Sequence, residues 1–359
     1  MTIAVLGAGG GGLSATIELT HYRNDVILWN RNPARLEPYR ATGEIPFRGI
    51  WGSGTSRPFE FSNDLADAVS RAETVVVCLP GVVHPQLFAD LARLKPSAQI
   101  ILNPGHTGGA LHLRTVFASL GVTPPPVAEF STLTYVARVD ADGTDHIMGR
   151  AGKVSAACLP GGQEALDAAV RLFHGATPVS DVLASSLSNV NLVLHPPGAI
   201  LGAAWVEATG GDFTFYVDGM TPGVGRVLDQ LDAERLAVAS AFGHTLPSLL
   251  EEMIEVGTVD VEAAKRGDTV AAIRGGVANS TISAPDSFSH RYYQEDLAFG
   301  LQPFIALATV AGVDVPVANS LLKLGGIAVG GDLLSHGLTG ASLGLDGLSR
   351  DELVASVTS

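Results

Sequence analysis

Short apolar runs alternate with helix-like segments along the first half of the chain. The run Thr2 to Leu6 ends at a cluster of glycines, and a helical pattern follows from Leu13 to about Tyr22. A second strand-like run then spans Asp25 to Trp29. A strand, a glycine turn, a helix and a strand in this order predict a βαβ unit.

The same alternation continues to about residue 150. Continuous apolar runs are typical of strands in a parallel sheet that is covered on both faces. The pattern therefore predicts a doubly wound α/β domain. Its further strands are expected at Thr74 to Leu79, Gln99 to Leu102, Val127 to Tyr135 and Asp145 to Met148, and its helices at Pro85 to Leu94 and Leu111 to Leu120.

After about residue 180 the strand signals fade and helical spacing dominates. A helical stretch from Ser185 to Ala208 should be interrupted at Pro196 and Pro197. Two domains of ordinary size suit the 359 residues, and we expect a doubly wound sheet in residues 1–180 and an all-helical domain in residues 181–359. The other helices are expected at Pro222 to Phe242, Leu246 to Val256, Val259 to Arg266, Tyr292 to Ala311 and Val315 to Val329.

The chain is acidic, with 36 Asp and Glu residues against 22 Lys and Arg residues. Nucleic-acid binding depends on clustered cations, so this balance argues against a nucleic-acid partner. No uncharged run of about 18 residues indicates a membrane span. The two cysteines, Cys78 and Cys158, lie in no metal-binding or disulfide pattern. These features favour a soluble cytoplasmic protein without a metal site.

The glycine cluster fits the pattern G-x-G-x-x-G through Gly7, Gly9 and Gly12. It follows a strand and opens a helix, which is the context in which this pattern binds a dinucleotide. The first glycine permits the tight turn, the second lets the backbone approach the pyrophosphate, and the third lets the helix pack closely on the strand. A Rossmann-type domain is therefore expected here, with the phosphates at the helix N-terminus. The alternative is a flexible glycine turn without a ligand.

The end of the second strand predicts how the adenosine ribose of the cofactor is recognised. NAD-preferring sites usually place Asp or Glu there, where it accepts from the ribose 2′-hydroxyl. This chain has Asn30 and Arg31 instead, so no carboxylate repels a 2′-phosphate and Arg31 can pair with one. We therefore expect NADP in preference to NAD, unless Arg31 is only a solvated surface side chain.

Two further loops follow apolar strands, one at Leu79 and Pro80 and the other at Asn103. The carboxyl ends of parallel strands line the ligand crevice of such a domain. These three residues are therefore predicted to lie along the ribose and nicotinamide. A purely structural turn explains each of them equally well.

The helical half carries a histidine in a distinctive segment. Asn191 and His195 lie four residues apart, on one face of a helix, and Pro196 and Pro197 follow directly. A histidine can move a proton near neutral pH, provided that a carboxylate orients it. The segment 291–296 offers such carboxylates, but the sequence alone does not show that the two segments meet. A histidine in a helix is more often structural.

Four groups of segments lie in order along nearly the whole chain: Gly7-x-Gly9-x-x-Gly12, Leu102-Asn103-Pro104-Gly105 with Thr107-Gly108-Gly109, Asn189-x-Asn191-x-x-x-His195-Pro196, and Arg291-Tyr292 with Glu295-Asp296. Taken together, these motifs resemble the octopine/nopaline dehydrogenases, the opine dehydrogenase family. The resemblance implies that an L-amino acid condenses with a 2-oxo acid such as pyruvate, and that NAD(P)H reduces the resulting imine to an N-(1-carboxyalkyl) amino acid.

The resemblance also implies roles for single residues. The catalytic histidine of the family falls on His195, and its aspartate partner falls on Asp296. Both substrates carry carboxylates, so Arg291 is the first candidate for a carboxylate clamp and Asn191 the second. Arg291 could instead pair with Glu295 at i, i+4 spacing. A homodimer is a further expectation from the family.

Two other functions fit part of the pattern. Ketopantoate reductase and glycerol-3-phosphate dehydrogenase also join a Rossmann domain to a helical one and reduce a ketone without an amine. They rely on a lysine in the helical domain, where this chain has only Lys265 and Lys323, neither in a convincing site motif. The third possibility is a non-catalytic NADP(H)-binding sensor, which would not need both His195 and Asp296.

Overall fold

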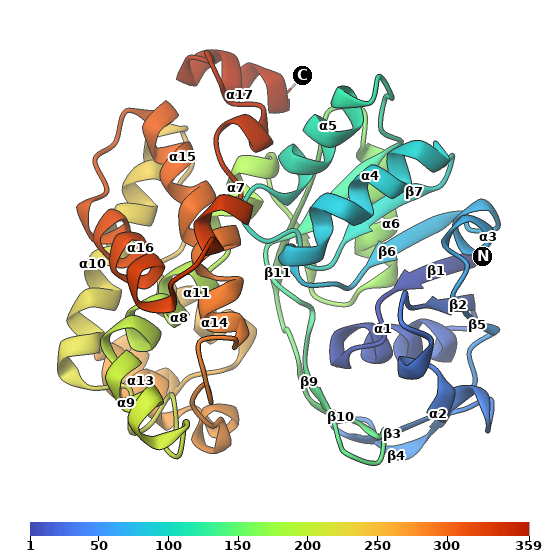
Figure 1. Cartoon of the computed structure of the whole chain (residues 1–359), viewed down its shortest axis with the longest axis horizontal. Helices are drawn as coiled ribbons and strands as arrows, with labels where there is room; N and C mark the ends of the chain where they lie inside the picture. The colour runs from blue at the N-terminus through green and yellow to red at the C-terminus, as the bar shows by residue number, and fades with distance from the viewer. Residues whose placement is uncertain (359) are drawn as a thin grey trace. The chain divides into compact units, whose positions relative to one another are not determined.

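The computed structural model describes residues 1–358, apart from the side chain of Ala278. The chain forms two compact units, shown in Figure 1. Unit 1 comprises Met1–Gly105 and Gly109–Val182. Unit 2 comprises His106–Gly108 and the chain from Leu183 onward, so the short segment 106–108 belongs with the second unit although the first surrounds it in sequence.

Unit 1 is built on an eight-stranded sheet with the order β12-β11-β8-β7-β6-β1-β2-β5. All neighbouring strands are parallel except β8 and β11. The fully apolar runs became its central strands, which are buried on both faces, and the expected Rossmann-type sheet is confirmed. The strands are β1 (Thr2–Leu6), β2 (Asp25–Trp29), β5 (Glu60–Ser62), β6 (Thr74–Val77), β7 (Gln99–Leu102), β8 (Val127–Phe130), β11 (Val154–Cys158) and β12 (Ala176–Pro178).

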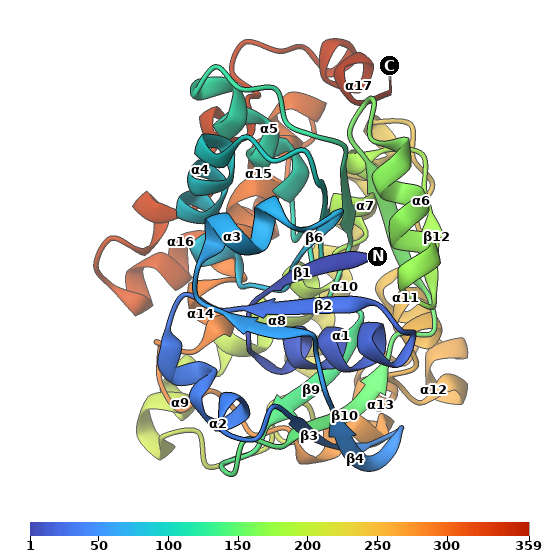
Figure 2. The same ribbon diagram turned by 90° about the vertical axis from the view of Figure 1, so that its right-hand side faces the viewer.

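Helices connect these strands, and α4 and α5 lie side by side in both views of Figures 1 and 2. The first helix begins three residues earlier than the apolar pattern indicated, because the glycines themselves form its first turn. The helices and 3-10 turns of unit 1 are α1 (Gly10–His21), η1 (Pro33–Arg35), α2 (Glu37–Arg40), α3 (Leu65–Ser70), η2 (Gly81–Val83), α4 (His84–Leu94), α5 (Gly109–Ser119) and α6 (Gln163–Leu172).

Unit 1 also contains a second sheet that the sequence did not predict. It has the order β4-β3-β10-β9, with β3 (Ile45–Gly49), β4 (Gly52–Ser56), β9 (Tyr135–Val139) and β10 (Asp145–Arg150). Figure 2 shows these strands grouped below α1. The expected single strand Val127 to Tyr135 is therefore wrong. Strand β8 ends at Phe130, the side chain of Asn103 accepts from the backbone N–H of Thr134, and the chain enters the second sheet at Tyr135.

A buried carboxyl joins α1 to this second sheet. Asp145 on β10 is fully buried, and its Oδ2 accepts a hydrogen bond of 2.7 Å from the Ser14 hydroxyl. Its Oδ1 has no hydrogen-bond partner in the described part of the chain. Desolvation raises the pKa of Asp145 to about 7, against the lowering effect of the Ser14 hydrogen bond and with a smaller rise from Asp140.

Stability should therefore fall as the pH rises. The folded pKa of Asp145 lies above its ordinary value of 3.8, so the folded state binds a proton more tightly than the unfolded chain. This contribution is full below about pH 4 and is lost as the pH rises to about 7. In thermal melts from pH 5 to pH 8, the melting temperature of Asp145→Asn should rise relative to that of the parent protein as the pH rises. An equal pH dependence of both melting temperatures would contradict this prediction.

Unit 2 is helical in its described part, apart from an isolated β-bridge between Thr214 and Ser283. The expected all-helical second half is confirmed. Its helices are α7 (Val182–Leu187), α8 (Asn191–Leu201), α9 (Ala203–Thr209), α10 (Pro222–Ala241), α11 (Leu249–Val256), α12 (Val261–Lys265), α13 (Thr269–Gly275), α14 (Arg291–Gln294), α15 (Gln302–Ala311), α16 (Pro316–Val329) and α17 (Arg350–Thr358), with 3-10 turns η3 (Val277–Thr281), η5 (Leu333–His336) and η6 (Ala341–Leu343) and a π-helical turn η4 (Leu297–Leu301).

Two predicted helical stretches of unit 2 are divided differently in the structure. Pro196 and Pro197 lie inside α8, which ends at Leu201, so the interruption predicted at the prolines is wrong. The expected stretch Ser185 to Ala208 is instead broken between α7 and α8 and again at Gly202, before α9. The prolines lack only the N–H groups that would bond to the carbonyls of Leu192 and Val193, and the rest of the helix keeps its packing. The expected single helix from Tyr292 to Ala311 is instead α14, η4 and α15 in succession.

Within residues 1–358 no single helix is long and apolar enough to cross a membrane. One bent pair, Pro316–Val329 with Leu333–Leu343, passes the same test of length and composition when its two parts are combined.

Candidate functional site

The glycine loop of unit 1 has the shape of a phosphate cradle. Gly7 has φ +123°, a left-handed conformation, and a Cβ there would collide with the carbonyl oxygen of Cys78. A Cβ at Gly12 would collide with the carbonyl of Gly7, so the close approach of α1 to the loop needs glycine. A Cβ at Gly9, in contrast, would meet nothing within 4 Å, and Gly9 is exposed. The loop therefore leaves open backbone at Gly9, at the N-terminus of α1, where a phosphate can approach.

The end of β2 is organised by Asn30. Its Oδ1 accepts from the backbone N–H of Ala8 at 3.1 Å, and its amide nitrogen donates to the Asn32 carbonyl at 3.0 Å. Asn30 thus ties the glycine loop to the turn that follows β2. Arg31 is exposed and forms no ion pair with the described residues.

Arg35, at the end of η1, is a second exposed cation without an ion pair in residues 1–358. Sequence reasoning did not single it out, although its spacing of four residues from Arg31 was a usable signal. Asn32 caps the turn between them, because its side chain accepts from the N–H of Ala34 at 3.1 Å. Two unpaired guanidinium groups thus flank a capped turn directly after β2.

The two other loops predicted to contact the cofactor differ in the solvent exposure of their side chains. Leu79 is half-buried and Pro80 is exposed, directly after β6, and the Leu79 carbonyl lies 3.0 Å from Nε2 of His84. Asn103 is fully buried, and its amide bonds to the hydroxyl and the backbone N–H of Thr134 at 2.9 and 3.1 Å. Asn103 therefore fixes the loop after β7 through its side chain.

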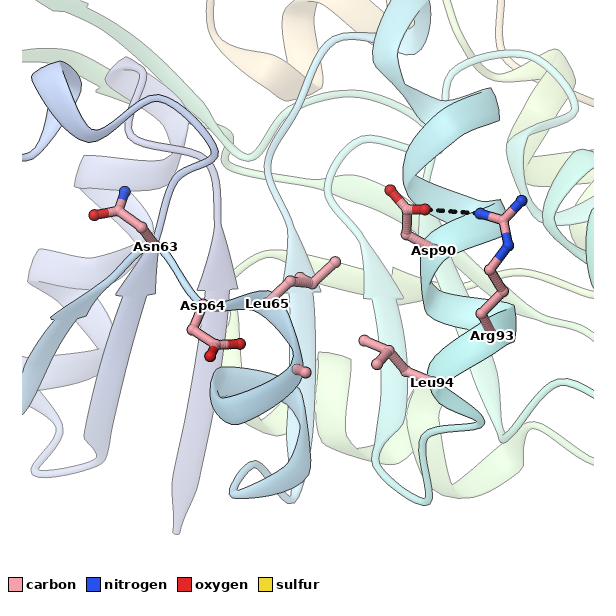
Figure 3. Close-up of a pocket in the computed structure, with 7 residues that line it drawn as sticks. Asn63, Asp64, Leu65, Asp90, Arg93 and Leu94 are labelled. Carbon is pink, nitrogen blue, oxygen red and sulfur yellow. Dashed lines mark hydrogen bonds and ion pairs between the residues drawn. The ribbon is translucent and has the colours of Figure 1, made fainter.

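Figure 3 shows a shallow hollow on the surface of unit 1. None of the predicted site residues lines it. Asp90 and Arg93 form an ion pair of 2.8 Å there, and Asp64 caps α3. Asn63 donates to the Asn30 carbonyl at 2.6 Å, which places one edge of the hollow beside the end of β2. The lining residues are Asn63, Asp64, Leu65, Ala66, Asp90, Arg93 and Leu94.

In unit 2 the structure brings His195 and Asp296 together. His195 lies on α8, and Asp296 lies between α14 and the π-helical turn η4. Nδ1 of His195 is 2.7 Å from Oδ2 of Asp296, and both side chains are almost completely buried. An irregular π-helical turn of this kind is often found at functional sites. His195 and Asp296 are 101 positions apart in sequence, and they form the histidine–carboxylate pair that the sequence could only suggest.

Arg291 opens α14, five residues before Asp296. The i, i+4 ion pair with Glu295 does not form; Glu295 instead lies 3.0 Å from Nε2 of His106. Desolvation lowers the pKa of the Arg291 guanidinium, but Tyr292, Asp296 and Glu295 outweigh it, and the net shift is upward. Arg291 keeps part of its surface exposed although neighbouring groups desolvate its guanidinium, and it remains cationic without an ion pair in the described residues. It is therefore available to a carboxylate ligand.

Aromatic side chains surround the histidine. The ring of Tyr292 stacks on the imidazole of His195 at a centroid distance of 3.9 Å, and Phe215 meets it edge-on at 6.4 Å. The hydroxyl of Tyr216 lies 2.8 Å from Nε2 of His195. No spacing pattern in the sequence links residue 216 to residue 195, so the contact between Tyr216 and His195 is visible only in the structure.

Asn191 stands at the first position of α8, one turn before His195, and is half-buried. Its backbone N–H is held by the side chain of Asn189 at 3.2 Å. Asn189 also donates to the hydroxyl of Thr107 at 3.1 Å, and the N–H of Gly108 donates to Ser186 at 3.0 Å. These bonds fasten the segment 106–108 to α7 and to the turn before α8, so Thr107 of one motif contacts Asn189 of the other.

No group of three or more His, Cys, Asp or Glu residues in the described part of the chain has the arrangement of a metal site.

Comparison with known proteins gives consistent matches. A family model for the α-helical domain of NAD/NADP octopine/nopaline dehydrogenases matches residues 178–329. An opine dehydrogenase of Arthrobacter sp. (strain 1C) is 32% identical, over 99% of this chain and 98% of its own length. An octopine dehydrogenase of Pecten maximus is 24% identical, over 95% of this chain and 94% of its own length.

Solved structures share the fold over nearly the whole chain. An octopine dehydrogenase with NADH and L-arginine has a TM-score of 0.76 at 19% identity, covering 99% of this chain and 98% of that one. A yersinopine dehydrogenase with NADP+ has a TM-score of 0.74 at 17% identity, covering 99% and 97%. A ketopantoate reductase from Ralstonia eutropha JMP134 has a lower TM-score of 0.63 at 17% identity, covering 92% and 98%.

Proposed function

This chain belongs to the octopine/nopaline dehydrogenase family, and we propose that it condenses an L-amino acid with a 2-oxo acid such as pyruvate and reduces the imine. It is an NAD(P)-dependent oxidoreductase that acts on CH–NH bonds. The product is an N-(1-carboxyalkyl) amino acid. The observation that carries the proposal is the buried pair of His195 and Asp296 in the helical unit, next to the unpaired cation Arg291.

His195 is the acid and base of the reaction. Condensation requires a proton on the departing oxygen of the oxo acid, and reduction of the imine leaves a secondary amine that exchanges a proton. Asp296 accepts the Nδ1–H of His195, which holds the ring in one tautomer and stabilises the imidazolium form. A histidine is suited to this exchange near neutral pH.

Arg291 binds a substrate carboxylate. Its planar guanidinium can donate two parallel hydrogen bonds to a carboxylate, and no acidic side chain of the described residues occupies it. Asn191 is proposed as a second contact, because it lies one turn from His195 on the same helix.

The residues of unit 1 fit a dinucleotide. The open backbone at Gly9 and the N-terminus of α1 would receive the pyrophosphate, and Asn30 and Arg31 would receive the adenosine ribose. Leu79, Pro80 and Asn103 belong to the loops that follow β6 and β7, on the same edge of the sheet, and are proposed to line the rest of the cofactor. The cofactor supplies the hydride that reduces the imine.

We propose further that NADPH is preferred to NADH. No carboxylate stands at the end of β2, and both Arg31 and Arg35 are exposed and without an ion pair in the described residues. A 2′-phosphate would gain charge-assisted hydrogen bonds from them.

Replacement of Arg31 and Arg35 by alanine should weaken the binding of NADPH without weakening the binding of NADH. A hydrogen bond to a charged group contributes about 1.5–3 kcal/mol, so KM for NADPH should rise at least about tenfold in the double variant. Arg57→Ala, which removes an exposed arginine paired with Glu44, is the matched control. Equal changes for both cofactors would show that the two arginines do not read the 2′-phosphate.

The alternative functions are not favoured. Lys265 is exposed and paired with Glu262, and Lys323 lies in a surface hollow beside η5. Neither lysine is placed to act with the His195–Asp296 pair as the lysine of a ketopantoate-type reductase would. A non-catalytic sensor would not explain a buried, hydrogen-bonded His195–Asp296 pair beside an unpaired cation.

The test is oxidation of NADPH at 340 nm with pyruvate and pooled L-amino acids, repeated with NADH. Oxidation that requires both the oxo acid and an amine supports the proposal, and the active pool identifies the amino-acid class. Oxidation of NADPH with the oxo acid alone would contradict the proposal and would indicate a simple ketone reductase. Binding of NADPH without any oxidation, across all pools and several 2-oxo acids, would favour a sensor.

We also propose a cytoplasmic location and a homodimer. The formal net charge of −14 and the absence of any cysteine pattern for disulfides support the first. The second follows from the family alone, and sedimentation equilibrium of the purified protein tests it.

A further inference from the structure

Both ring nitrogens of His195 are engaged. Nδ1 is 2.7 Å from Oδ2 of Asp296, and Nε2 is 2.8 Å from the hydroxyl of Tyr216. A carboxylate only accepts, so Nδ1 carries the hydrogen in the neutral ring and Nε2 is the acceptor. Tyr216 therefore donates its O–H to Nε2. A substrate has no direct access to a lone pair of His195 in this arrangement.

The position of Tyr216 is fixed by its own turn. Thr214 and Asp218 close this turn with reciprocal hydrogen bonds, from the Thr214 hydroxyl to Asp218 at 2.7 Å and from the Asp218 N–H to the Thr214 hydroxyl at 3.0 Å. The N–H of Phe215 bonds to the Ile282 carbonyl at 2.9 Å. The turn is thus anchored on both sides, and the contact of Tyr216 with His195 is part of the fold.

A second hydroxyl continues the chain of hydrogen bonds. The hydroxyl of Tyr216 lies 3.1 Å from the hydroxyl of Tyr292, whose ring stacks on His195. When His195 is protonated, its Nε2–H can donate to Tyr216, and the Tyr216 hydrogen can turn to Tyr292 or to a substrate. A phenol can donate and accept, so the same contact serves both protonation states of the histidine.

We propose that the hydroxyl of Tyr216 is the group through which His195 exchanges its proton with the substrate. This inference rests on the proposed function. In the forward step Tyr216 gives its proton to the departing oxygen of the substrate and takes the Nε2 proton of the imidazolium. The lone pair of the substrate nitrogen forms the C=N bond as the C–O bond breaks, water leaves, His195 becomes neutral and Tyr216 is unchanged. The imidazolium is formed beforehand, when the ammonium group of the incoming amino acid gives one proton through the same hydroxyl to Nε2 and its free amine attacks the oxo group.

The surroundings keep Tyr216 in the form that such a step needs. Burial raises the pKa of Tyr216 well above its ordinary value of 10, Tyr292 and Asp296 add to the rise, and Arg291 opposes it. The phenol therefore stays neutral while it relays the proton. The other titratable groups around the pair are His290, whose pKa is lowered to about 4 mainly by desolvation, and Glu295, which lies 3.0 Å from Nε2 of His106.

The test compares three phenylalanine variants. Tyr216→Phe keeps the ring and removes the relay, so kcat should fall about a hundredfold, the usual effect of a lost proton-transfer group, while KM for both substrates stays within a few-fold. Tyr292→Phe keeps the stacked ring and should lower kcat less. Tyr293→Phe is the matched control, because its hydroxyl donates to the Ala199 carbonyl at 2.8 Å and not to His195.

Two further readouts separate a relay from a structural role. The solvent deuterium isotope effect on kcat should rise in Tyr216→Phe, and remain at the parent value in Tyr293→Phe. If Tyr216→Phe does not fold, 3-fluorotyrosine at position 216 replaces it, and kcat should change with the acidity of the phenol at nearly constant volume.

The outcomes are distinct. A kcat of Tyr216→Phe within threefold of the parent, or above it, overturns the inference and means that Tyr216 only covers His195. An unchanged kcat with 3-fluorotyrosine overturns it as well. If the parent protein shows no amine-dependent oxidation of NADPH, the proposed function has failed. If the parent protein is active and His195→Ala is inactive, a Tyr216→Phe enzyme with a normal kcat refutes only the relay through Tyr216.

Discussion

Replacement of His195 by alanine should lower kcat for amine-dependent oxidation of NADPH at least about a hundredfold, the usual scale for the loss of a general acid and base. His195 is almost completely buried and hydrogen-bonded on both ring nitrogens, so alanine removes both hydrogen bonds and the proton-carrying group at once. The glycine loop and the end of β2 belong to unit 1, so the Kd of NADPH, measured by fluorescence, should change little.

His174→Ala is the control for this variant, because His174 is an exposed histidine of unit 1. It should retain the parent rate. A His195→Ala enzyme that turns over at a near-normal rate, with its fold intact by circular dichroism, would remove His195 from the mechanism.

Asp296→Asn should have an effect of similar size, on the order of 10²–10⁴ in kcat. The side chain keeps its shape but loses the charge that stabilises the imidazolium. An amide that turns its NH2 group toward Nδ1 would also favour the opposite tautomer of His195, with the hydrogen on Nε2. Steady-state kinetics should show the loss in kcat, with KM for the oxo acid less affected because Arg291 remains.

Asp351→Asn makes the same change on the exposed first turn of α17, outside the His195–Asp296 pair, and should leave kcat unchanged. The combined variant His195→Ala with Asp296→Asn should be little worse than either single variant, because the two residues act as a unit. Additive losses would mean that Asp296 acts on the substrate by itself.

The fold could be predicted where local patterns carry the information. Fully apolar runs such as Thr74 to Leu79 became buried parallel strands, because only such runs can be covered on both faces. The second sheet was missed for the opposite reason. Strand β4 reads GSGTS, has four exposed residues and exists because it pairs with β3. Pairing between distant segments overrides local propensity there.

The candidate site divides in the same way. The glycine loop was readable because the tight turn, the open backbone and the close helix packing each demand glycine at a fixed spacing. The pairing of His195 with Asp296 across 101 residues was suggested only by the family resemblance, because no local rule connects α8 with the turn after α14. No local rule placed Tyr216 beside His195, since its position depends on a turn that Thr214 and Asp218 close.

The prolines of α8 show why local rules can also mislead. Pro196 and Pro197 should end a helix, but α8 continues to Leu201, because buried side chains on both sides of the prolines hold the segment. Tertiary packing outweighed two missing hydrogen bonds.

We propose that one enzyme both joins an amine to an oxo acid and reduces the imine. Mass spectrometry of the product, made with pyruvate, the active amino acid and NADPH deuterated at the transferable position, tests this proposal most directly. The expected product contains both carbon skeletons joined through nitrogen, with one deuterium on the carbon derived from the oxo group of pyruvate. Deuterated lactate beside an unchanged amino acid would contradict the claim.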